Sequence, residues 1–262
     1  MDPLIAVAMP VRGRHSLVRK TILRLHRQKG VRVIVVCVGN PEDREVCEAV
    51  GAEFFEHENA PLGRKWQFAF ERCRDFNPDA VLYAGSSDWF TKGWAKKLYA
   101  KAIRLERVVG MLGIYFIDIA LDGFRVVWWS GYEAHSDRKE ETIGAGRLLP
   151  RCVLDKADWK VFDPKLNASL DYSMERNVGK SVAVSVPEFS ASISTFAWDN
   201  KHSFRSTAEM GHVKCLNKLE CMEVIMDKFP DAALVWESMT GGMYHGVCSL
   251  PDGRPDRGNQ DR

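Results

Sequence analysis

The chain has 262 residues, of which 45% are hydrophobic and 27% charged, and it carries a formal net charge of +2. Its apolar stretch near the amino terminus has only six residues, and no stretch approaches the ~18 apolar residues of a membrane span, so we predict neither a secretory signal nor a membrane span. The seven cysteines include no CxxC pair and no spacing typical of a structural zinc site. These features favour a soluble, cytoplasmic protein with reduced cysteines.

Strands and helices are expected to alternate over the first hundred residues. Apolar runs of strand length predict buried strands at residues 4–9, 31–38 and 80–84, and a brief strand at 53–55. Helical spacing of apolar residues predicts helices from Leu17 to a stop at Gly30, and at 44–50, 65–76 and 91–106. This alternation predicts an α/β, Rossmann-like domain with a mixed, mostly parallel central sheet flanked by helices.

The second half has a less regular pattern. Strands are expected at residues 108–117 and 124–129, joined by a hairpin turn at 121–123. A flexible loop at 144–147 precedes a helix at 151–157, and a last long helix is expected at 208–229. We divide the chain into one domain of residues 1–204, with halves at about 1–107 and 108–204, a helical C-terminal extension at 205–250, and a disordered tail at 251–262.

The loop after the first predicted strand is the first candidate binding segment. It reads Pro10-Val11-Arg12-Gly13-Arg14 and leads into a helix. Free backbone N–H groups and the dipole at a helix amino terminus favour phosphate, and arginine adds charge-assisted hydrogen bonds. Neither a P-loop nor a GxGxxG fingerprint is present. We predict that Pro10, Val11, Arg12 and Arg14 bind a nucleotide, and the alternative is a polar loop with solvated arginines.

A second candidate segment precedes the helix at 65–76. A tight Pro-Leu-Gly turn at 61–63 would aim Lys65 and the first amides of that helix at an anion. We expect Asn59, Gly63 and Lys65 to contact the same nucleotide. The alternative is a turn that only starts a helix.

The apolar run at 80–84 ends in small polar residues and one carboxylate, Asp88. Open α/β sheets hold substrates and metal-bound phosphates at the carboxyl ends of such buried strands. A divalent cation that bridges a diphosphate needs hard oxygen ligands, so we predict that Asp88 binds Mn²⁺ or Mg²⁺. Ser86 and Ser87 are predicted to bond to the phosphate or to metal-bound water. The alternative for Asp88 is an N-cap of the helix at 91–106.

Four residues of the second half are further candidates. Asp171 follows a stretch of turn-forming residues, and it either takes the proton of an acceptor hydroxyl group or caps a helix. His202 either completes a metal site or is a structural histidine. The pair Trp128 and Trp129 either stacks on a sugar ring or base, or belongs to the core.

The order of these segments resembles the GT-A glycosyltransferases, in particular the family-2-like group. The matching segments are a Pro-Val-x-x-Arg-like loop at 10–14, a polar loop at 33–43, an Asn-x-x-x-Gly turn and helix at 59–69, an Asp-containing element at 85–90, a Gly-x-Gly-Arg-like loop at 144–147 and a late carboxylate at 171. The resemblance covers about residues 4–200 and implies a GT-A-like catalytic domain. It also implies that Gly144, Gly146 and Arg147 bind the acceptor.

The resemblance implies a hexosyltransferase-like enzyme that moves a sugar from a nucleotide-sugar donor, a UDP-sugar by default, to a hydroxyl group. The basic residues of the two loops would hold the nucleotide, a divalent cation on Asp88 would neutralise the leaving diphosphate, and Asp171 would be the base of an inverting reaction. Two segments depart from the family. Residues 37–43 lack the usual aspartates directly after the second strand, and Glu42 or Asp43 could serve only if the loop folds back. Gly85 and Ser87 stand where further carboxylates are common.

Two acceptor classes are consistent with the sequence. A glycan or small molecule is the default of the family. Eight Lys and Arg with no acidic residue between Arg12 and Arg32 also fit duplex DNA, in which a hydroxymethylated base would be the acceptor, or else form a solvated face. A catalytically silent nucleotide-sugar or nucleic-acid binding module of the same fold is the alternative to an enzyme.

Overall fold

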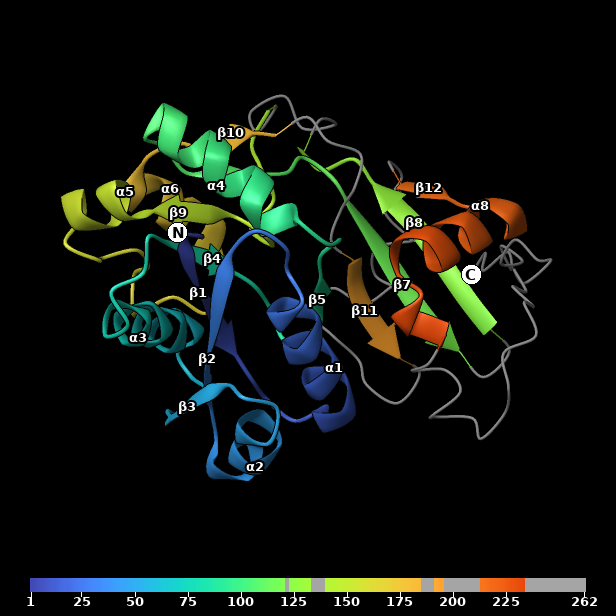
Figure 1. Ribbon diagram of the computed structural model, residues 1–262, viewed down its shortest axis with the longest axis horizontal. Coiled ribbons are helices and arrows are strands. Elements are labelled where there is room, and N and C mark those ends of the chain that lie inside the picture. Colours follow the sequence, from blue (N-terminus) through green and yellow to red (C-terminus); the bar gives the residue numbers. More distant parts are fainter. Residues whose placement is uncertain (121–122, 133–139, 185–190, 196–212, 234–262) are drawn as a thin grey trace, which may run out of the picture.

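The computed structural model describes residues 1–120, 123–132, 140–184, 191–195 and 213–233 (Figure 1). The first half contains β1 (Leu4–Pro10), α1 (His15–His26), β2 (Arg32–Gly39), η1 (Pro41–Asp43), α2 (Arg44–Glu48), β3 (Glu53–Glu56), α3 (Leu62–Arg74), β4 (Ala80–Tyr83), β5 (Asp88–Trp89) and α4 (Trp94–Leu105). The second half contains β6 (Val109–Gly110), β7 (Ile114–Ala120), β8 (Gly123–Trp129), β9 (Leu148–Pro150), α5 (Arg151–Lys156), α6 (Leu170–Val178), β10 (Val182–Ala183), β11 (Ala191–Thr195), β12 (Val213–Cys215), α8 (Lys218–Glu223) and η3 (Val224–Lys228).

Seven strands form the central sheet, in the order β10-β6-β9-β4-β1-β2-β3. β1 pairs in parallel with β2 on one side and with β4 on the other, and β3 continues in parallel beyond β2. β9 is antiparallel to both of its neighbours, β4 and β6, and β10 is parallel to β6. Every strand except β9 therefore points the same way, and the predicted mixed, mostly parallel sheet flanked by helices is confirmed.

This topology brings five loops to one edge of the sheet. β1, β2, β3 and β4 are parallel, so the segments that follow them (residues 11–14, 40–43, 57–61 and 84–87) leave from the same edge. Because β9 runs the opposite way, the loop that precedes it, residues 144–147, lies there too. We call this the loop edge. Ligands of open α/β sheets bind at the carboxyl ends of parallel strands, so the loop edge is the candidate site.

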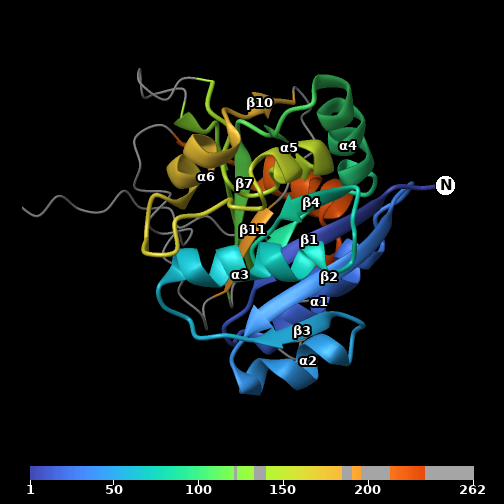
Figure 2. The same ribbon diagram turned by 90° about the vertical axis from the view of Figure 1, so that its left-hand side faces the viewer.

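Helices cover both faces of the central sheet (Figure 2). One core cluster contains apolar residues of α1 and α4, among them Val18, Ile22 and Leu98. A second cluster, on the other face, contains residues of α3, α5 and α6, among them Phe70 and Met174. The apolar residues whose spacing predicts α1, α3 and α4 are buried, except Leu105 at the end of α4, which is exposed, and α6 was not predicted.

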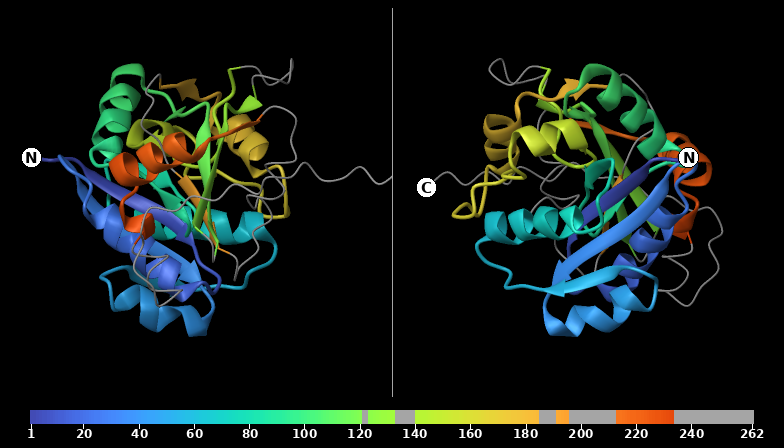
Figure 3. Two further views of the ribbon diagram at one scale, coloured as in Figure 1. Left: turned by 90° about the vertical axis from the view of Figure 1, so that its right-hand side faces the viewer. Right: turned by 60° about the vertical axis from the view of Figure 1, so that its left-hand side comes forward.

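A second sheet of five strands was not predicted. Its order is β12-β8-β7-β11-β5, and α8 and η3 (orange in Figure 3, left) pack against it through the cluster that joins Ile117, Val126 and Phe229. β5 has only two residues and enters this sheet by pairing Asp88 with Ser192, far along the chain. A strand of two residues is too short to show an alternating pattern in the sequence, and its pairing partner lies far away along the chain.

Two expected elements are wrong in their bounds. The apolar run at 108–117 is divided between β6 of the central sheet and β7 of the second sheet, because the chain crosses from one sheet to the other between them. At this crossing Gly113 packs closely on Trp128, since a Cβ on Gly113 would lie 2.5 Å from the Trp128 ring. Of the helix expected at 208–229, residues 213–215 form β12, and residues 208–212 lie outside the described residues. The helix begins at Lys218, because the Asn217 side chain caps it in a capping box with Glu220.

The remaining expectations are close to the structure. The helices at 44–50, 65–76, 91–106 and 151–157 are present, with ends moved by at most three residues. β7 and β8 pair up to Ala120 and Gly123, which confirms the hairpin, although residues 121–122 themselves are outside the described residues. So is the tail at 251–262, and the domain bounds stay predictions.

Cysteine state and helix length agree with the sequence analysis as far as the structure reaches. The five cysteines whose state is described, Cys37, Cys47, Cys73, Cys152 and Cys221, are free. Among the described residues, no helix has both the length and the apolar character needed to cross a membrane.

Candidate functional site

The loop after β1 turns sharply into α1. Val11 is 1% exposed and donates its N–H to the carbonyl of Val38 (2.8 Å), which extends the β1–β2 pairing beyond Pro10. Gly13 and Arg14 then adopt the left-handed region, with φ of 59° and 53°. This turn places the amino end of α1, which has no acidic residue in its first turn, at the loop edge. A helix amino end beside the exposed Arg12 suits a phosphate group.

Asp43, at the end of η1, holds this turn in place. Its side chain is fully buried and accepts hydrogen bonds from the N–H of Gly13 (2.9 Å) and of Asn40 (3.2 Å), and its Oδ1 lies 2.9 Å from Nε2 of His15. From the sequence, Glu42 or Asp43 could take the place of the family's aspartates only if this loop folds back. The structure shows that the buried acid of this segment supports the β1–α1 turn from within the protein.

Lys65, in the first turn of α3, connects to the same loop. Its Nζ donates to the carbonyl of Val11 (2.6 Å) and to Oδ1 of Asn59 (3.0 Å), and the residue is 1% exposed. Burial lowers the pKa of Lys65 to about 8, an effect that the charge of Asp43 opposes and that of Arg12 reinforces. Lys65 therefore brings a buried positive charge under residues 11–14, and its contact with a nucleotide stays a prediction.

Gly63 contacts a different segment. Its N–H donates to the carbonyl of Leu166 (2.7 Å), and a Cβ on Gly63 would lie only 2.1 Å from the carbonyl oxygen of Asp163. The absence of a side chain lets the start of α3 pack directly on residues 163–166. Gly63 thus fixes the position of α3, whereas Lys65 reaches the loop after β1 and Asn59 contacts Lys65.

The loops after β1 and β4 meet through Arg14. Its Nη2 donates to Oγ of Ser86 (2.9 Å), across a separation of 72 residues. Thr21 of α1 strengthens the contact, because its Oγ1 donates to the carbonyl of Ser86 (3.0 Å) and accepts from Nε1 of Trp89 (2.9 Å). The two segments that the sequence analysis assigned to one site therefore lie side by side.

Asp88 lies near the contact between Arg14 and Ser86, but its side chain is largely enclosed. It is 8% exposed, and its Oδ2 accepts the N–H of Gly85 (2.7 Å). Burial raises the pKa of Asp88, while the Gly85 hydrogen bond and the charge of Arg14 oppose that rise. The neighbouring Ser87 is 5% exposed. The N-cap alternative for Asp88 is wrong, because the N-cap of α4 is Gly93.

The donor set for a metal ion is small. Among the described residues, no three His, Cys, Asp or Glu side chains gather as a metal site, and His202 lies outside those residues. Asp88 is a carboxylate close enough to Arg14, in the loop after β1, for the charge of Arg14 to affect its pKa. One carboxylate fits an ion that takes its other ligands from phosphate oxygens and water, which is how Mg²⁺ is usually held.

Arg147, expected to bind the acceptor, points into the protein. Its side chain is fully buried, and its guanidinium donates to Oγ1 (3.0 Å) and the carbonyl of Thr142, and to Oε1 of Glu175 (3.3 Å). Its Nη1 also donates to the backbone carbonyl of Asp171 (3.1 Å). Arg147 therefore ties the loop at 144–147 to the first turn of α6 and so positions Asp171.

Asp171 packs its carboxylate on the glycine of that loop. A Cβ on Gly144 would lie 2.1 Å from Oδ1 of Asp171, so the carboxylate occupies the space that a side chain would need. Gly146, with φ of 76°, donates its N–H to the carbonyl of Tyr83 (2.8 Å). The cap alternative for Asp171 is wrong, because Ser169 is the N-cap of α6 and makes no side-chain cap bond.

Tyr83, the last residue of β4, was missed by the sequence analysis. Its ring lies 4.1 Å from that of Trp66 between centroids. Burial raises the pKa of Tyr83 well above its usual value, and the charges of Asp171 and Asp88 raise it further. Its hydroxyl therefore stays protonated and lies within electrostatic reach of both carboxylates. The sequence signal was its place as the last residue of a buried strand before small residues.

The two tryptophans do not form one platform. Trp128 and Trp129 are both half-buried and are consecutive residues of β8, so their side chains lie on opposite faces of the second sheet. Trp128 packs on Tyr115 (4.7 Å between centroids), whereas Trp129 packs edge-on against Tyr132 (5.2 Å).

Comparisons with known proteins support the fold. No protein-family model matches the chain, and no curated protein matches its sequence. TarS 1-349 of S. aureus in complex with UDP has a TM-score of 0.52 at 12% identity, covering 72% of this chain and 60% of that one. A second structure of TarS 1-349 has a TM-score of 0.50 at 12% identity and covers 91% and 74%. A longer TarS structure has a TM-score of 0.50 at 12% identity and covers 73% and 37%.

This chain thus spans 60% of the UDP-bound TarS chain and 37% of the longer one. TarS is a GT-A-type glycosyltransferase. At this level of identity the likeness concerns the arrangement of strands and helices. The chain has a GT-A-like α/β fold, and its loop edge carries the candidate site.

Proposed function

We propose that the protein transfers a sugar from a nucleotide-sugar donor to an acceptor hydroxyl group. The contact between Arg14 and Ser86 carries the proposal, because it joins the two donor-side loops at the edge where the loop at 144–147 also lies. The GT-A-like fold shared with TarS, a glycosyltransferase, supports the same reaction class. The acceptor hydroxyl belongs to a glycan, to a small molecule or to a hydroxymethylated base in DNA.

The donor side is cationic. Arg12 and Arg14 would bind the diphosphate together with the amino end of α1, and Lys65 would add its charge from beneath the loop. The TarS structure contains UDP, which supports a uridine diphosphate donor. Binding at this turn depends on Asp43, which holds the N–H of Gly13 and keeps the turn in its left-handed conformation.

A divalent cation would bind Asp88 and the diphosphate, and His202 is a second ligand in this proposal. When bound, Mn²⁺ or Mg²⁺ offsets negative charge on the leaving diphosphate. The protein's own positive charge would come from Arg14, which lies near Asp88 and donates to Ser86, so that its guanidinium would already be oriented when the donor phosphates bind.

Asp171 would act as the base of an inverting reaction. Its carboxylate accepts the acceptor hydroxyl proton while the acceptor oxygen forms a bond to the anomeric carbon. The bond from that carbon to the diphosphate oxygen breaks on the opposite face, and the nucleoside diphosphate leaves with the electron pair. The backbone of Asp171 is held by Arg147, and its carboxylate is packed on Gly144, so the base is positioned before the substrate binds.

Titration calorimetry and UDP release with a panel of UDP-sugars, with and without Mn²⁺, test the proposal. We expect Asp88→Asn to abolish metal-dependent transfer and sugar hydrolysis while the protein stays folded. Asp158→Asn is the matched control, because Asp158 is an exposed aspartate on the surface and undergoes the same chemical change. Donor binding that ignores metal, with no hydrolysis of any donor, would instead indicate a silent binding module.

Asp171→Asn separates the base from the donor site. The variant should lose transfer far more than donor binding, because the amide keeps the shape of the side chain but cannot accept the proton. Equal losses in turnover and in donor affinity would contradict the role of Asp171 as a base.

A further inference from the structure

Two neighbouring segments of the chain carry basic charges without any acid. Residues 12–32 contain eight Lys and Arg, and residues 89–105 contain five, and neither segment contains Asp or Glu. They form α1 and α4, which pack on the same face of the central sheet. Gln28 joins them, since its side chain donates to the carbonyl of Thr91 (3.0 Å) and accepts the N–H of Ala95 (3.2 Å). The two helices therefore present one surface of a single charge sign.

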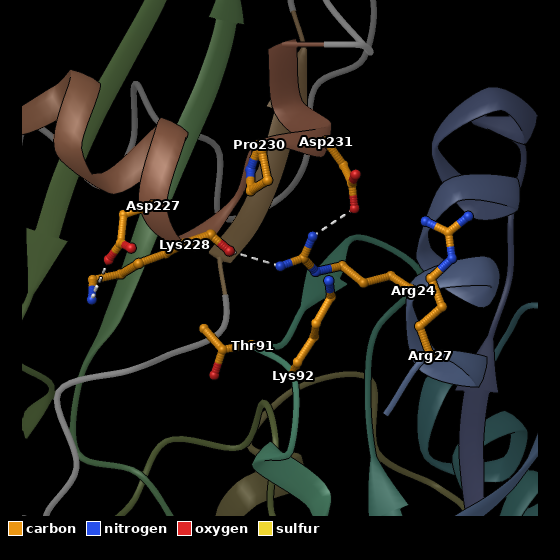
Figure 4. Close-up of a pocket in the computed structure, with 8 residues that line it drawn as sticks. All are labelled: Arg24, Arg27, Thr91, Lys92, Asp227, Lys228, Pro230 and Asp231. Atoms are coloured by element: carbon orange, nitrogen blue, oxygen red, sulfur yellow. Dashed lines mark hydrogen bonds and ion pairs between the residues drawn. The ribbon is translucent and has the colours of Figure 1, made fainter. Parts of the chain in front are cut away.

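A cavity of about 280 Å³ opens where these two segments meet the C-terminal part (Figure 4). The cavity is separated from the loop edge along the axis of α1. Arg24 follows Arg14 by ten residues, which corresponds to about 15 Å at the rise of an α-helix. We call it the basic pocket. Its lining residues are Arg24, Arg27, Thr91, Lys92, Asp227, Lys228, Pro230 and Asp231.

Arg24 forms the rigid wall of the basic pocket. Its guanidinium donates to the carbonyls of Phe90 (3.0 Å) and Lys228 (2.7 Å) and to Oδ2 of Asp231 (2.6 Å). It also lies over the rings of Trp89 and Phe229, at 5.4 Å and 5.3 Å from their centroids. These contacts hold the Arg24 side chain in place, and the carboxylate of Asp231 compensates its charge.

The remaining charges of the lining do not cancel. Lys228 pairs with Asp227 at 3.6 Å. Arg27 and Lys92 are then left, both exposed, and no acidic residue of the lining remains to compensate them. Two positive charges face one small space, which favours an anionic occupant.

The size and surroundings of the basic pocket indicate which anion. At about 280 Å³ it has room for a phosphate group. The basic charge continues beyond it, because Lys96 of α4 lies against Gly30, where a Cβ would come within 2.5 Å of the Lys96 side chain. An extended row of cations matches a chain of phosphates, since duplex DNA carries one charge per ~1.7 Å of axis.

A membrane surface fits these observations less well. The apolar residues in the first turns of α4, Trp94, Ala95 and Leu98, are buried against the central sheet. The start of α4, next to the basic pocket, therefore offers no apolar face to a bilayer, and the exposed Ile103 and Leu105 lie in its last turn. We infer that the α1–α4 surface, centred on Arg27 and Lys92 in the basic pocket, binds the backbone phosphates of a nucleic acid. The inference holds whether or not the chain transfers a sugar.

Fluorescence anisotropy with a labelled DNA duplex of about 20 base pairs, without any donor sugar, tests this surface in salt from about 50 to 200 mM. The test variant is Arg27→Gln/Lys92→Gln. The matched control is Lys156→Gln/Lys160→Gln, which removes two exposed lysines elsewhere on the surface and gives the same net charge. The full-length chain is used throughout, and circular dichroism checks that each variant is folded.

We expect the wild type to bind the duplex with an affinity that falls steeply with salt. In the test variant the slope of log affinity against log salt should fall by about 2, one for each phosphate that the variant no longer neutralises, and the control should keep the wild-type slope. No duplex binding by the wild type at the lowest salt, or equal slopes in the two variants, would overturn the inference. So would binding to phosphatidylserine vesicles that exceeds binding to the duplex. A wild type that does not bind the duplex would also remove DNA from the proposed acceptors, but because no donor is present, none of these results tests sugar transfer itself.

Discussion

A methyl group on Gly144 should displace the proposed base. The Cβ of an alanine there would lie 2.1 Å from Oδ1 and 2.8 Å from Oδ2 of Asp171, whereas ordinary contact begins at 3.4 Å. The carboxylate must therefore move by roughly 1 Å or turn away, because Arg147 holds the backbone of Asp171 in place. A misplacement of about 1 Å costs about 100-fold in rate, or about 2.7 kcal/mol in transition-state stabilisation.

Steady-state release of UDP from a UDP-sugar measures the effect on turnover, and calorimetry with UDP measures donor binding. We expect Gly144→Ala to lower turnover by about 100-fold and to leave UDP affinity unchanged. In an Asp171→Ala background the clash disappears, so the added Gly144→Ala should cost little, and the two changes should be strongly non-additive. Wild-type turnover in Gly144→Ala would refute the placement of the base. Additive losses would show that Gly144 acts through some other contact.

Three further changes test the buried polar groups around the site. Lys65→Met should destabilise the protein by about 1–3 kcal/mol, because buried acceptors lose their donor. Its deficit against wild type should grow as pH rises from about 8 towards 10.5, because over this range the unfolded chain holds a proton that folded Lys65 has lost, so that a higher pH stabilises the wild type and not the variant. Unfolding in urea at neutral and alkaline pH measures the difference, and a deficit that does not change with pH would contradict the lowered pKa. Arg147→Met should cost about 3–5 kcal/mol by denaturant unfolding, because Glu175 loses its cation, and the cost should be smaller in a Glu175→Gln background; an equal cost in both would contradict this pairing. Thr21→Val should cost about 1–3 kcal/mol in thermal unfolding, because the indole N–H of Trp89 loses its acceptor, and the loss should shrink when Trp89→Phe is also present.

Local patterns in the sequence predicted most of the central sheet. The apolar runs that become β1, β2 and β4 are buried on both faces, which is why their lengths alone indicate strands of a covered parallel sheet. Parallel strands share one carboxyl edge, and so the meeting of Arg14 and Ser86 followed from the order of the segments. Composition and run length are local properties, and a single sequence shows them directly.

The second sheet and the acceptor side depend on pairings that no local pattern shows. The run at 108–117 is uniformly apolar, yet it supplies strands to two different sheets. Arg147 reads as an exposed loop residue in the sequence, but its partner Glu175 lies 28 residues away and draws the guanidinium into the protein. Tyr83 gains its place beside two carboxylates only when the loop at 144–147 binds to the end of β4.

By itself the sequence determined a parallel α/β sheet, the cationic turn after its first strand and the carboxylate after its fourth, because each depends on the character of a few consecutive residues. Tertiary structure alone decided that Asp88 is enclosed between Gly85 and Arg14, that Arg147 positions Asp171, and that α1 and α4 join into one basic surface. These outcomes depend on how buried charges find partners across long separations in the chain, and such partners are selected only when the sheet and its helices have packed together.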